Sequence, residues 1–347
     1  MRGVKISDNI VSRKLKSRTT MNINAKLTNT FATIRFNLSK FLYLLLLSLI
    51  SFNTYANTSH DLTTPILVDS QWLKTHFIQK DKQVVILDLR TREAYLKGHI
   101  PTAINIPFEK FNRSLNKVEG FLITPLSFQE LMEKNGIKSS DHLILYSDKT
   151  ILEATRVYWS FDFYGHKKLS VLNGGLVAWQ KDIGTTEIKP NTLNPSKYEA
   201  SIDPQKFASK FKTAMATKHN NTYLLDARTF EEYSGEKSRT DVFGHIPTAK
   251  NLPWKRLVKP SETSEKDDSD FQYLSLYKLE EQFKDIPQDA NIIAYCNGGK
   301  EASVLYLGLK LIGREAAIYD GSWYEWSSDK SLPITPPNNG VKHEHNQ

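Results

Sequence analysis

The chain of 347 residues exceeds the size of one average domain and can hold two domains with separate buried cores. Its formal net charge of +8 lies entirely before Asn57, where nine Lys and Arg residues accompany one acidic residue, Asp8. The rest of the chain is close to neutral, which excludes a strongly basic surface for nucleic acid. The single cysteine excludes an internal disulfide.

The first part of the chain has the order of segments that is typical of a secretory signal. A basic stretch precedes an apolar run from Phe41 to Ile50, and Thr54-Tyr-Ala56 follows. The apolar run has about ten residues, whereas a membrane span needs roughly 20. We therefore expect residues 1–56 to be a cleaved signal peptide, with Met21 as an alternative start. The mature protein would then be exported to the periplasm without a membrane anchor.

An internal repeat organises the rest of the chain. The first copy contains Asp88-Leu-Arg90, followed by Gly98-His-Ile-Pro-Thr-Ala103. The second contains Asp226-Ala-Arg228, followed by Gly244-His-Ile-Pro-Thr-Ala249. Matches in the same order at two places predict two domains of one fold.

Each copy alternates short apolar strands with helical patterns. The predicted elements are strands at 84–87 and 143–146 with a helix over 153–163, and strands at 223–225 and 292–295 with a helix over 301–311. Strands that alternate with helices at this spacing indicate parallel α/β units. We therefore predict an α/β fold of two domains, each a parallel sheet flanked by helices.

Polar and Pro-containing stretches suggest the boundaries of these domains. We assign 63–186 to the first domain and 205–335 to the second, with 187–204 as a linker. The polar stretch 259–270 is an exposed loop and a candidate lid. The end of the chain, 336–347, is expected to be disordered.

Cys296 lies between a buried strand of the second copy and the helix that follows. In open α/β sheets, ligands bind beyond the carboxyl ends of the strands. Gly298 and Gly299 allow the backbone to curl so that N–H groups point inward, and the helix start adds positive potential. Both effects favour the nucleophilic thiolate, although many single cysteines are inert buried thiols. The first copy has Ser147 at the equivalent position.

Together these motifs resemble the tandem-domain rhodanese family of thiosulfate and 3-mercaptopyruvate sulfurtransferases. They are Asp-x-Arg and Gly-His-Ile-Pro-x-Ala in both copies, the Cys-x-x-Gly loop at Cys296, and Tyr319-Asp-Gly-Ser-Trp323. The resemblance covers about Ile66 to Pro333. It implies a non-catalytic first domain, with Ser147 in place of the cysteine, and a catalytic second domain.

The resemblance also implies a mechanism. Cys296 would attack a small anionic sulfur donor, hold the sulfur as a persulfide, and pass it to a thiol or to cyanide. No metal or organic cofactor is required. We expect a monomer, without a nucleic-acid partner and without membrane contact once the signal is cleaved.

The resemblance suggests that Arg228 holds the donor, while an ion pair with Asp226 or Glu231 is an equal alternative. The donor-binding loop is expected to comprise Asn297, Gly298, Gly299, Lys300 and Glu301. His99 and His245 begin the Gly-His-Ile-Pro turns and are expected to be structural.

The loop after Cys296 follows neither well-known family pattern. Thiosulfate-preferring members carry basic residues directly after the cysteine, and mercaptopyruvate-preferring members carry Gly and Ser there. In this chain the first basic residue after the cysteine is Lys300, four positions on, and Glu301 stands where Ser or Thr is usual. Similarity to the Cys-Asn-small-Gly-basic loop of short exported rhodaneses favours thiosulfate.

Two other functions are alternatives. A phosphatase or arsenate reductase of the same fold needs an arginine six positions after the cysteine to clamp the oxyanion, and that position is Ala302. The second alternative is a non-catalytic sulfur carrier or binding module that delivers a persulfide to one partner. The loop at Cys296 is compatible with this function as well.

Overall fold

The computed structural model describes residues 64–78, 84–148, 150–218, 221–260, 271–337 and 344–345. The expected signal peptide, with Met21, and residues 261–270 of the candidate lid lie outside these ranges. Within them, no helix has both the length and the apolar character to span a bilayer.

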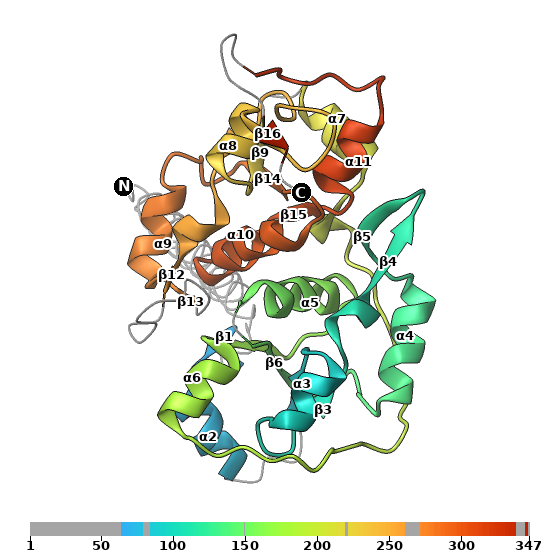
Figure 1. The fold of residues 1–347 in the computed structure, drawn as a ribbon, viewed down its shortest axis with the longest axis vertical. Helices are drawn as coiled ribbons and strands as arrows, with labels where there is room; N and C mark the ends of the chain where they lie inside the picture. Colours follow the sequence, from blue (N-terminus) through green and yellow to red (C-terminus); the bar gives the residue numbers. More distant parts are fainter. Residues whose placement is uncertain are drawn as a thin grey trace, which may run out of the picture. The chain divides into compact units, whose positions relative to one another are not determined.

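The first repeat copy forms a parallel five-stranded sheet in the order β1-β7-β6-β2-β3 (Figure 1). Its strands are β1 (Leu67–Val68), β2 (Val84–Asp88), β3 (Ile104–Asn105), β6 (His142–Tyr146) and β7 (Leu169–Leu172). Its helices are α2 (Ser70–Ile78), α3 (Arg92–Lys97), α4 (Pro125–Lys134), α5 (Leu152–Phe163) and α6 (Gly175–Asp182). A turn, η1 (Phe108–Phe111), leads into a hairpin of β4 (Asn112–Leu115) and β5 (Val118–Leu122).

The second copy repeats this topology, with a parallel sheet in the order β8-β15-β14-β9-β11. Its strands are β8 (Phe207–Ala208), β9 (Thr222–Asp226), β11 (Lys250–Asn251), β14 (Asn291–Tyr295) and β15 (Ala317–Tyr319). Its helices are α7 (Lys210–Ala216), α8 (Phe230–Ser234), α9 (Leu276–Phe283), α10 (Lys300–Leu311) and α11 (Ser322–Ser328). The short 3-10 turns are η2 (Pro204–Lys206) and η3 (Trp254–Leu257), and β12 (Val258–Pro260) and β13 (Phe271–Tyr273) form the matching hairpin.

The predicted α/β fold of two parallel sheets flanked by helices is confirmed. The central strands β6 and β14 are continuous apolar runs because helices cover both faces of a parallel sheet. The two predicted long helices are α5 and α10, each beginning one residue earlier than expected.

Helices α5 and α10 join the two domains. Both are buried around most of their circumference, as expected of helices packed on more than one side. They lie side by side in Figure 1, and the hydroxyl groups of Thr155 and Ser303 form a hydrogen bond of 2.7 Å between them. The apolar residues on the inner sides of both sheets therefore form one continuous core, while the outer sides have separate cores.

The expected linker runs along the first domain. Ser196 donates its N–H to the carbonyl of Glu133 at 3.0 Å, and the buried Tyr198 stacks on His166. Within the segment expected to be disordered, β16 (Glu344–His345) pairs with β10 (Lys237–Ser238).

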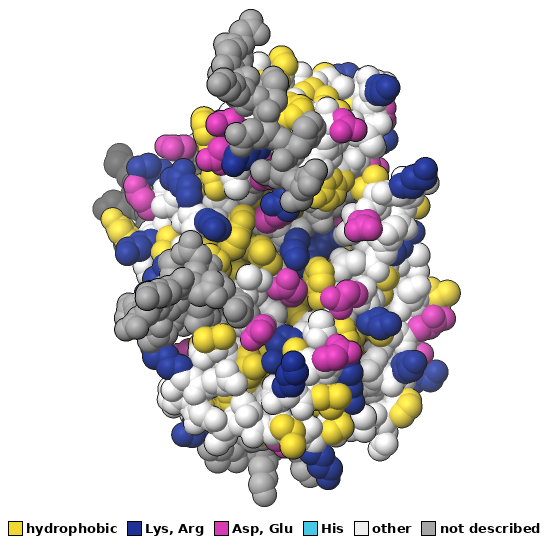
Figure 2. Space-filling view, in the orientation of Figure 1, with side chains coloured by type: hydrophobic (Ala, Val, Ile, Leu, Met, Phe, Trp, Pro, Cys, Tyr) yellow, Lys and Arg dark blue, Asp and Glu magenta, His cyan; other side chains and the backbone are white. Residues whose placement is uncertain are grey.

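Surface charge is mixed on the face drawn in Figure 2. Positive and negative side chains alternate over both domains instead of gathering in one basic patch. This agrees with the near-neutral charge of the chain beyond its first segment.

Candidate active site

Cys296 lies directly after β14, and its side chain is completely buried. The start of α11 holds the loop in place through backbone contacts. The Cys296 N–H donates to Ser322 Oγ at 3.2 Å, and its carbonyl accepts from the Trp323 N–H at 2.9 Å. The carbonyl of Asn297 accepts from the Tyr324 N–H, also at 2.9 Å. The loop is thus tied to the turn that contains the second domain's closing motif.

The conformation of the loop requires a glycine at position 299. Gly299 has a φ of +81°, and a Cβ placed there would lie 2.6 Å from Nη1 of Arg156. A Cβ on Gly298 would lie 3.3 Å from the ring of Tyr324. A side chain at Gly299 would collide with Arg156 and strain the backbone, whereas at Gly298 the Tyr324 ring would need to shift by only a few tenths of an ångström. The predicted curled backbone therefore depends on Gly299.

The protonation of Cys296 differs from the expected thiolate. Burial raises its pKa well above the ordinary value, and the charge and hydrogen bond of Glu301 raise it further. The N–H groups of Ala302 and Gly298 lower the pKa as expected, but they are outweighed. Cys296 at rest is therefore a thiol, because the surrounding fold buries its sulfur away from water.

A cavity of about 530 Å³ lies beside this loop, and both domains line it. Its lining includes Phe108, Arg113, Glu119, Gly120 and Arg156 from the first domain, and Arg239, Asn297, Gly298, Lys300, Glu301 and Tyr324 from the second. A larger cavity of about 990 Å³ lies near the starts of β9 and β14. That is the amino end of the sheet, away from Cys296, so the smaller cavity is the candidate site.

Two charged residues that sequence analysis missed, Arg239 and Glu232, form a network beside the loop. Arg239 donates from Nε to Oε1 of the buried Glu232 at 2.8 Å, and its Nη2 lies 3.9 Å from Oε1 of Glu301. Asn297 donates to the same Glu232 oxygen at 3.1 Å. Burial lowers the pKa of Arg239, but the two carboxylates outweigh it, so the net shift is upward.

A sequence signal for Arg239 existed. The turn glycine follows the repeat tyrosine by three residues in the first copy, Tyr95 to Gly98, and by eleven in the second, Tyr233 to Gly244. Arg239 lies in this insertion, which is present only in the copy that has the cysteine.

Lys300 lines the cavity, but its charge is paired. Its Nζ lies 3.2 Å from Oε1 of Glu153 on α5 and 5.3 Å from the centre of the Phe108 ring. The expected cation is therefore in the site and also links the two domains.

The rhodanese-like domain model matches this chain twice, over residues 69–182 and 207–329. The chain belongs to the rhodanese-like family. It is 28% identical to the 3-mercaptopyruvate sulfurtransferase of Escherichia coli K12 over 289 residues, covering 79% of this chain and 99% of that protein. It is also 28% identical to the sulfur carrier protein TtuD of Thermus thermophilus, covering 78% of this chain and 96% of TtuD.

A solved structure supports the same relationship. The crystal structure of SseA from Escherichia coli, described as a 3-mercaptopyruvate sulfotransferase, has a TM-score of 0.66 and 27% identity. The match covers 75% of this chain and 99% of that one. The chain is thus a sulfurtransferase-type enzyme with two rhodanese-like domains.

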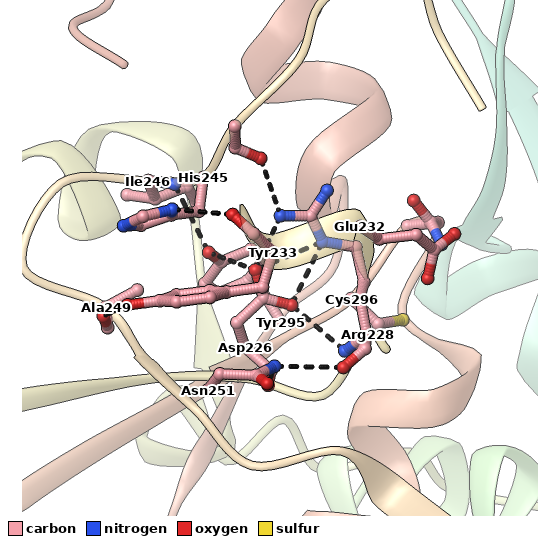
Figure 3. Close-up of polar contacts among 12 residues, drawn as sticks. Asp226, Arg228, Glu232, Tyr233, His245, Ile246, Ala249, Asn251, Tyr295 and Cys296 are labelled. Atoms are coloured by element: carbon pink, nitrogen blue, oxygen red, sulfur yellow. Dashed lines mark hydrogen bonds and ion pairs between the residues drawn. The ribbon is translucent and has the colours of Figure 1, made fainter. Parts of the chain in front are cut away.

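Arg228 does not line the cavity; of the two alternatives expected for it, donor contact or an ion pair with Asp226 or Glu231, the structure shows the ion pair with Asp226. It is buried, pairs with Asp226 at 2.6 Å, and donates to the carbonyl of Gly244 at 2.9 Å (Figure 3). Arg90 makes the same two contacts with Asp88 and Gly98 in the first domain. The ion pair therefore belongs to the scaffold of a rhodanese-like domain, because it bridges the strand end and the following turn in both copies.

The two turn histidines are structural, as expected. His99 stacks on Tyr95 with the ring centroids 3.7 Å apart, and His245 stacks on Tyr233 with the centroids 3.8 Å apart. In each pair the histidine Nδ1 contacts the backbone carbonyl of the same tyrosine. Burial lowers the pKa of His245. In the described part of the chain, no group of three or more His, Cys, Asp or Glu residues is arranged to hold a metal ion.

Proposed function

We propose that this enzyme moves sulfane sulfur from a small anionic donor, thiosulfate or 3-mercaptopyruvate, to cyanide or a thiol through a persulfide on Cys296. The position of that thiol carries the proposal. It lies at the carboxyl end of the central strand of the second sheet, beside a cavity built from both domains. Ligands bind at this edge of open α/β sheets.

The first half-reaction is covalent catalysis. With thiosulfate, the Cys296 sulfur attacks the outer sulfur and sulfite leaves with the electrons of the broken S–S bond. The N–H groups of Gly298 and Ala302 approach the Cys296 sulfur and favour negative charge there. An acceptor thiolate or cyanide then removes the outer sulfur and regenerates Cys296.

The cavity provides cations for the anionic end of the donor. Arg239 and Lys300 line it from the second domain, and Arg113 lines it from the first. Asn297, Gly298, Gly299 and Glu301 complete the proposed donor-binding loop. Arg228 lies outside the cavity lining, where it joins Asp226 to the Gly244 carbonyl.

Mass spectrometry tests the proposal directly. The protein is treated with thiosulfate or 3-mercaptopyruvate, and the peptide that contains Cys296 is expected to gain one sulfur atom. The Cys296→Ser variant should gain none and should lose sulfur transfer to cyanide. Retained transfer in this variant would rule out the mechanism.

The similarity to a sulfur carrier protein supports a second candidate function. A carrier would form the same persulfide but transfer it to one partner protein. Slow turnover with cyanide together with fast transfer to a protein acceptor would favour this function over general sulfurtransferase activity.

We also propose that the protein works in the periplasm, because residues 1–56 have the order of segments of a secretory signal, and that it is a monomer. Sequencing the N-terminus of the mature protein checks export. An N-terminus at residue 1 or 21, found in protein that remains outside the periplasmic fraction, would contradict export.

A further inference from the structure

Glu232 is a buried carboxylate that holds two side chains of the cavity wall. It lies in the first turn of α8, and its side chain is 2% exposed. Its Oε1 accepts hydrogen bonds from Arg239 Nε at 2.8 Å and from Asn297 Nδ2 at 3.1 Å. Both of these donors line the cavity beside the Cys296 loop, whereas Glu232 does not. Glu232 therefore reaches a ligand in the cavity through these two side chains.

The need to cap helix α8 does not explain this carboxylate. Glu232 Oε2 accepts the Thr229 N–H at 3.2 Å, and the Glu232 N–H donates to Thr229 Oγ1 at 3.3 Å, which forms a capping box. In the first copy of the repeat, the Thr91 hydroxyl caps α3 by accepting the Ala94 N–H, also at 3.3 Å. Ala94 stands at the position of Glu232. The same helix start is thus formed in the first domain without a carboxylate.

The partners of Glu232 also belong to the second copy alone. Asn297 directly follows the cysteine, and its counterpart in the first copy is Asp148, which follows Ser147. Arg239 lies in the insertion that the first copy lacks. The three interacting side chains therefore occur together only in the copy that has the nucleophile.

Glu232 determines which way the amide of Asn297 faces. A carboxylate oxygen that already accepts from Arg239 can only accept again, so the amide must turn its NH2 group toward Glu232. Asn297 Oδ1 is then buried without a hydrogen-bond partner among the described residues. An unsatisfied buried oxygen costs free energy. This orientation therefore does not serve stability, and Glu232 imposes it on the residue next to Cys296.

The contact with Arg239 holds the guanidinium group by one edge. Glu232 binds Nε at 2.8 Å, whereas Nη2 lies 3.9 Å from Glu301 Oε1, which is a longer and weaker contact. The Arg239 side chain is 45% exposed, so few other groups restrict it. The bond at Nε thus keeps this cation beside the loop, and its other nitrogen atoms remain available to an anion in the cavity.

We propose that Glu232 is a positioning residue for sulfur transfer, which holds the Arg239 guanidinium and the Asn297 amide in the arrangement that the donor meets. This inference rests on the proposed function of Cys296. Misplacing a group of the site by about 1 Å can slow a reaction roughly 100-fold. The loss of Glu232 is therefore expected to change the rate of sulfur transfer more than the stability of the fold.

The Glu232→Ala variant tests this inference, because it gives α8 the residue that α3 has at the same position. We measure single-turnover formation of the Cys296 persulfide over a range of thiosulfate concentrations. The rate constant at saturation is expected to fall by about tenfold or more, while the final amount of persulfide per protein stays the same. A variant that is only less well folded would show a smaller amount of persulfide and an unchanged rate constant.

Two control variants address helix capping and local charge. Thr229→Ala removes the cap and keeps Glu232, so it should lower the melting temperature without changing the rate constant. Glu231→Gln removes the neighbouring carboxylate in the first turn of α8, which does not line the cavity. It should also leave the rate constant unchanged.

A mutant cycle shows whether Glu232 acts through its two partners. Adding Glu232→Ala to the double variant Asn297→Ala/Arg239→Gln should slow persulfide formation no further, because the groups that Glu232 holds are already gone. A full additional loss in this background would overturn the inference. So would an unchanged rate constant in Glu232→Ala alone.

A second measurement separates this inference from the proposed function. If the wild-type protein forms no persulfide with thiosulfate or 3-mercaptopyruvate, the proposed function fails. Alkylation of Cys296 then tests Glu232 without sulfur transfer, through the ratio of the rates with anionic iodoacetate and neutral iodoacetamide. Arg239→Gln should lower this ratio more in the wild type than in Glu232→Ala, because only the wild type holds the cation in place. Equal decreases in both backgrounds would show that Glu232 does not position Arg239.

Discussion

The loops that follow β14 and β6 occupy equivalent positions in the two domains, yet only one lies beside an open cavity. Their scaffolds agree closely. Tyr295 donates its hydroxyl to Asp226 at 2.7 Å, and Tyr146 makes the same contact with Asp88. The framework of a rhodanese-like domain therefore does not by itself produce a site.

The difference lies in what the opposite domain places over each loop. The β4–β5 hairpin covers the Cys296 loop, and the Leu122 N–H donates to Asp320 at 3.1 Å. The β12–β13 hairpin covers the Ser147 loop in the same way, with the Tyr273 N–H donating to Asn173 at 3.0 Å.

Two residues before these matched N–H groups, the hairpins differ. The first has Gly120, whose position lies close to the Gly298 carbonyl and borders the cavity of about 530 Å³. The second has Phe271, whose buried ring packs beside Ser147 and Thr150. The described residues around Ser147 leave no space for a water molecule. Of these two loops, only the Cys296 loop has open space beside it, where a glycine stands in place of the aromatic ring in the covering hairpin.

Replacing the nucleophile should have the largest effect. Cys296→Ser makes the active loop resemble that of the first domain and is expected to abolish persulfide formation, since a hydroxyl group cannot hold sulfane sulfur. Mass spectrometry after donor treatment measures it. Adding Ser147→Cys to this variant should not restore the persulfide, because Phe271 occupies the approach. A persulfide on residue 147 would contradict the comparison.

The next largest effect should come from the link between hairpin and loop. Asp320 accepts hydrogen bonds from Arg156 and Leu122, and all three residues are buried. Asp320→Asn leaves the Arg156 charge unpaired, which is expected to lower the free energy of unfolding by about 3 kcal/mol. Urea denaturation measures the loss. The control is Asn173→Asp at the equivalent position, and equal losses in the two variants would show that the ion pair has no special role.

A smaller effect should follow from closing the cavity. Gly120→Phe copies the covering residue of the inactive loop onto the active one. A ring in the cavity is expected to lower kcat/KM by blocking the donor. The positive φ of Gly120, +91°, and the approach of a Cβ to 2.9 Å from the Gly298 carbonyl oxygen should also lower the free energy of unfolding by about 1–3 kcal/mol. Steady-state kinetics with either donor checks this. The reciprocal Phe271→Gly variant should lose stability but keep its kcat/KM. A similar loss of kcat/KM in both variants would show that the loss comes from damage to the fold and not from closing the cavity.

The smallest effect is expected from Lys300→Ala. The Lys300 side chain, which pairs with Glu153, is 39% exposed, and such partly exposed ion pairs contribute about 0.5 kcal/mol to stability. The thiosulfate rate should fall more than the mercaptopyruvate rate, because thiosulfate carries more negative charge. Unchanged rates with both donors would remove Lys300 from the donor site.

Sequence alone determined the features that depend on local pattern. The repeat predicted two domains of one α/β fold, the apolar runs placed β6 and β14, and the glycines marked the loop after Cys296. These predictions succeed because hydrophobic runs, turn residues and motif order are properties of short segments. The same reasoning placed Ser147 at the position of the first copy that is equivalent to Cys296 in the second.

Tertiary structure decided which side chains meet at the site. Arg228 belongs to the same repeat copy as Cys296 but packs into the scaffold, while Arg239 reaches the cavity from an insertion. The protonation of Cys296 also follows from packing, since burial and Glu301 outweigh the loop's N–H groups. Gly120 and Phe271 act on the opposite domain's loop. Such effects depend on distances between segments far apart in the chain, which the order of residues does not contain.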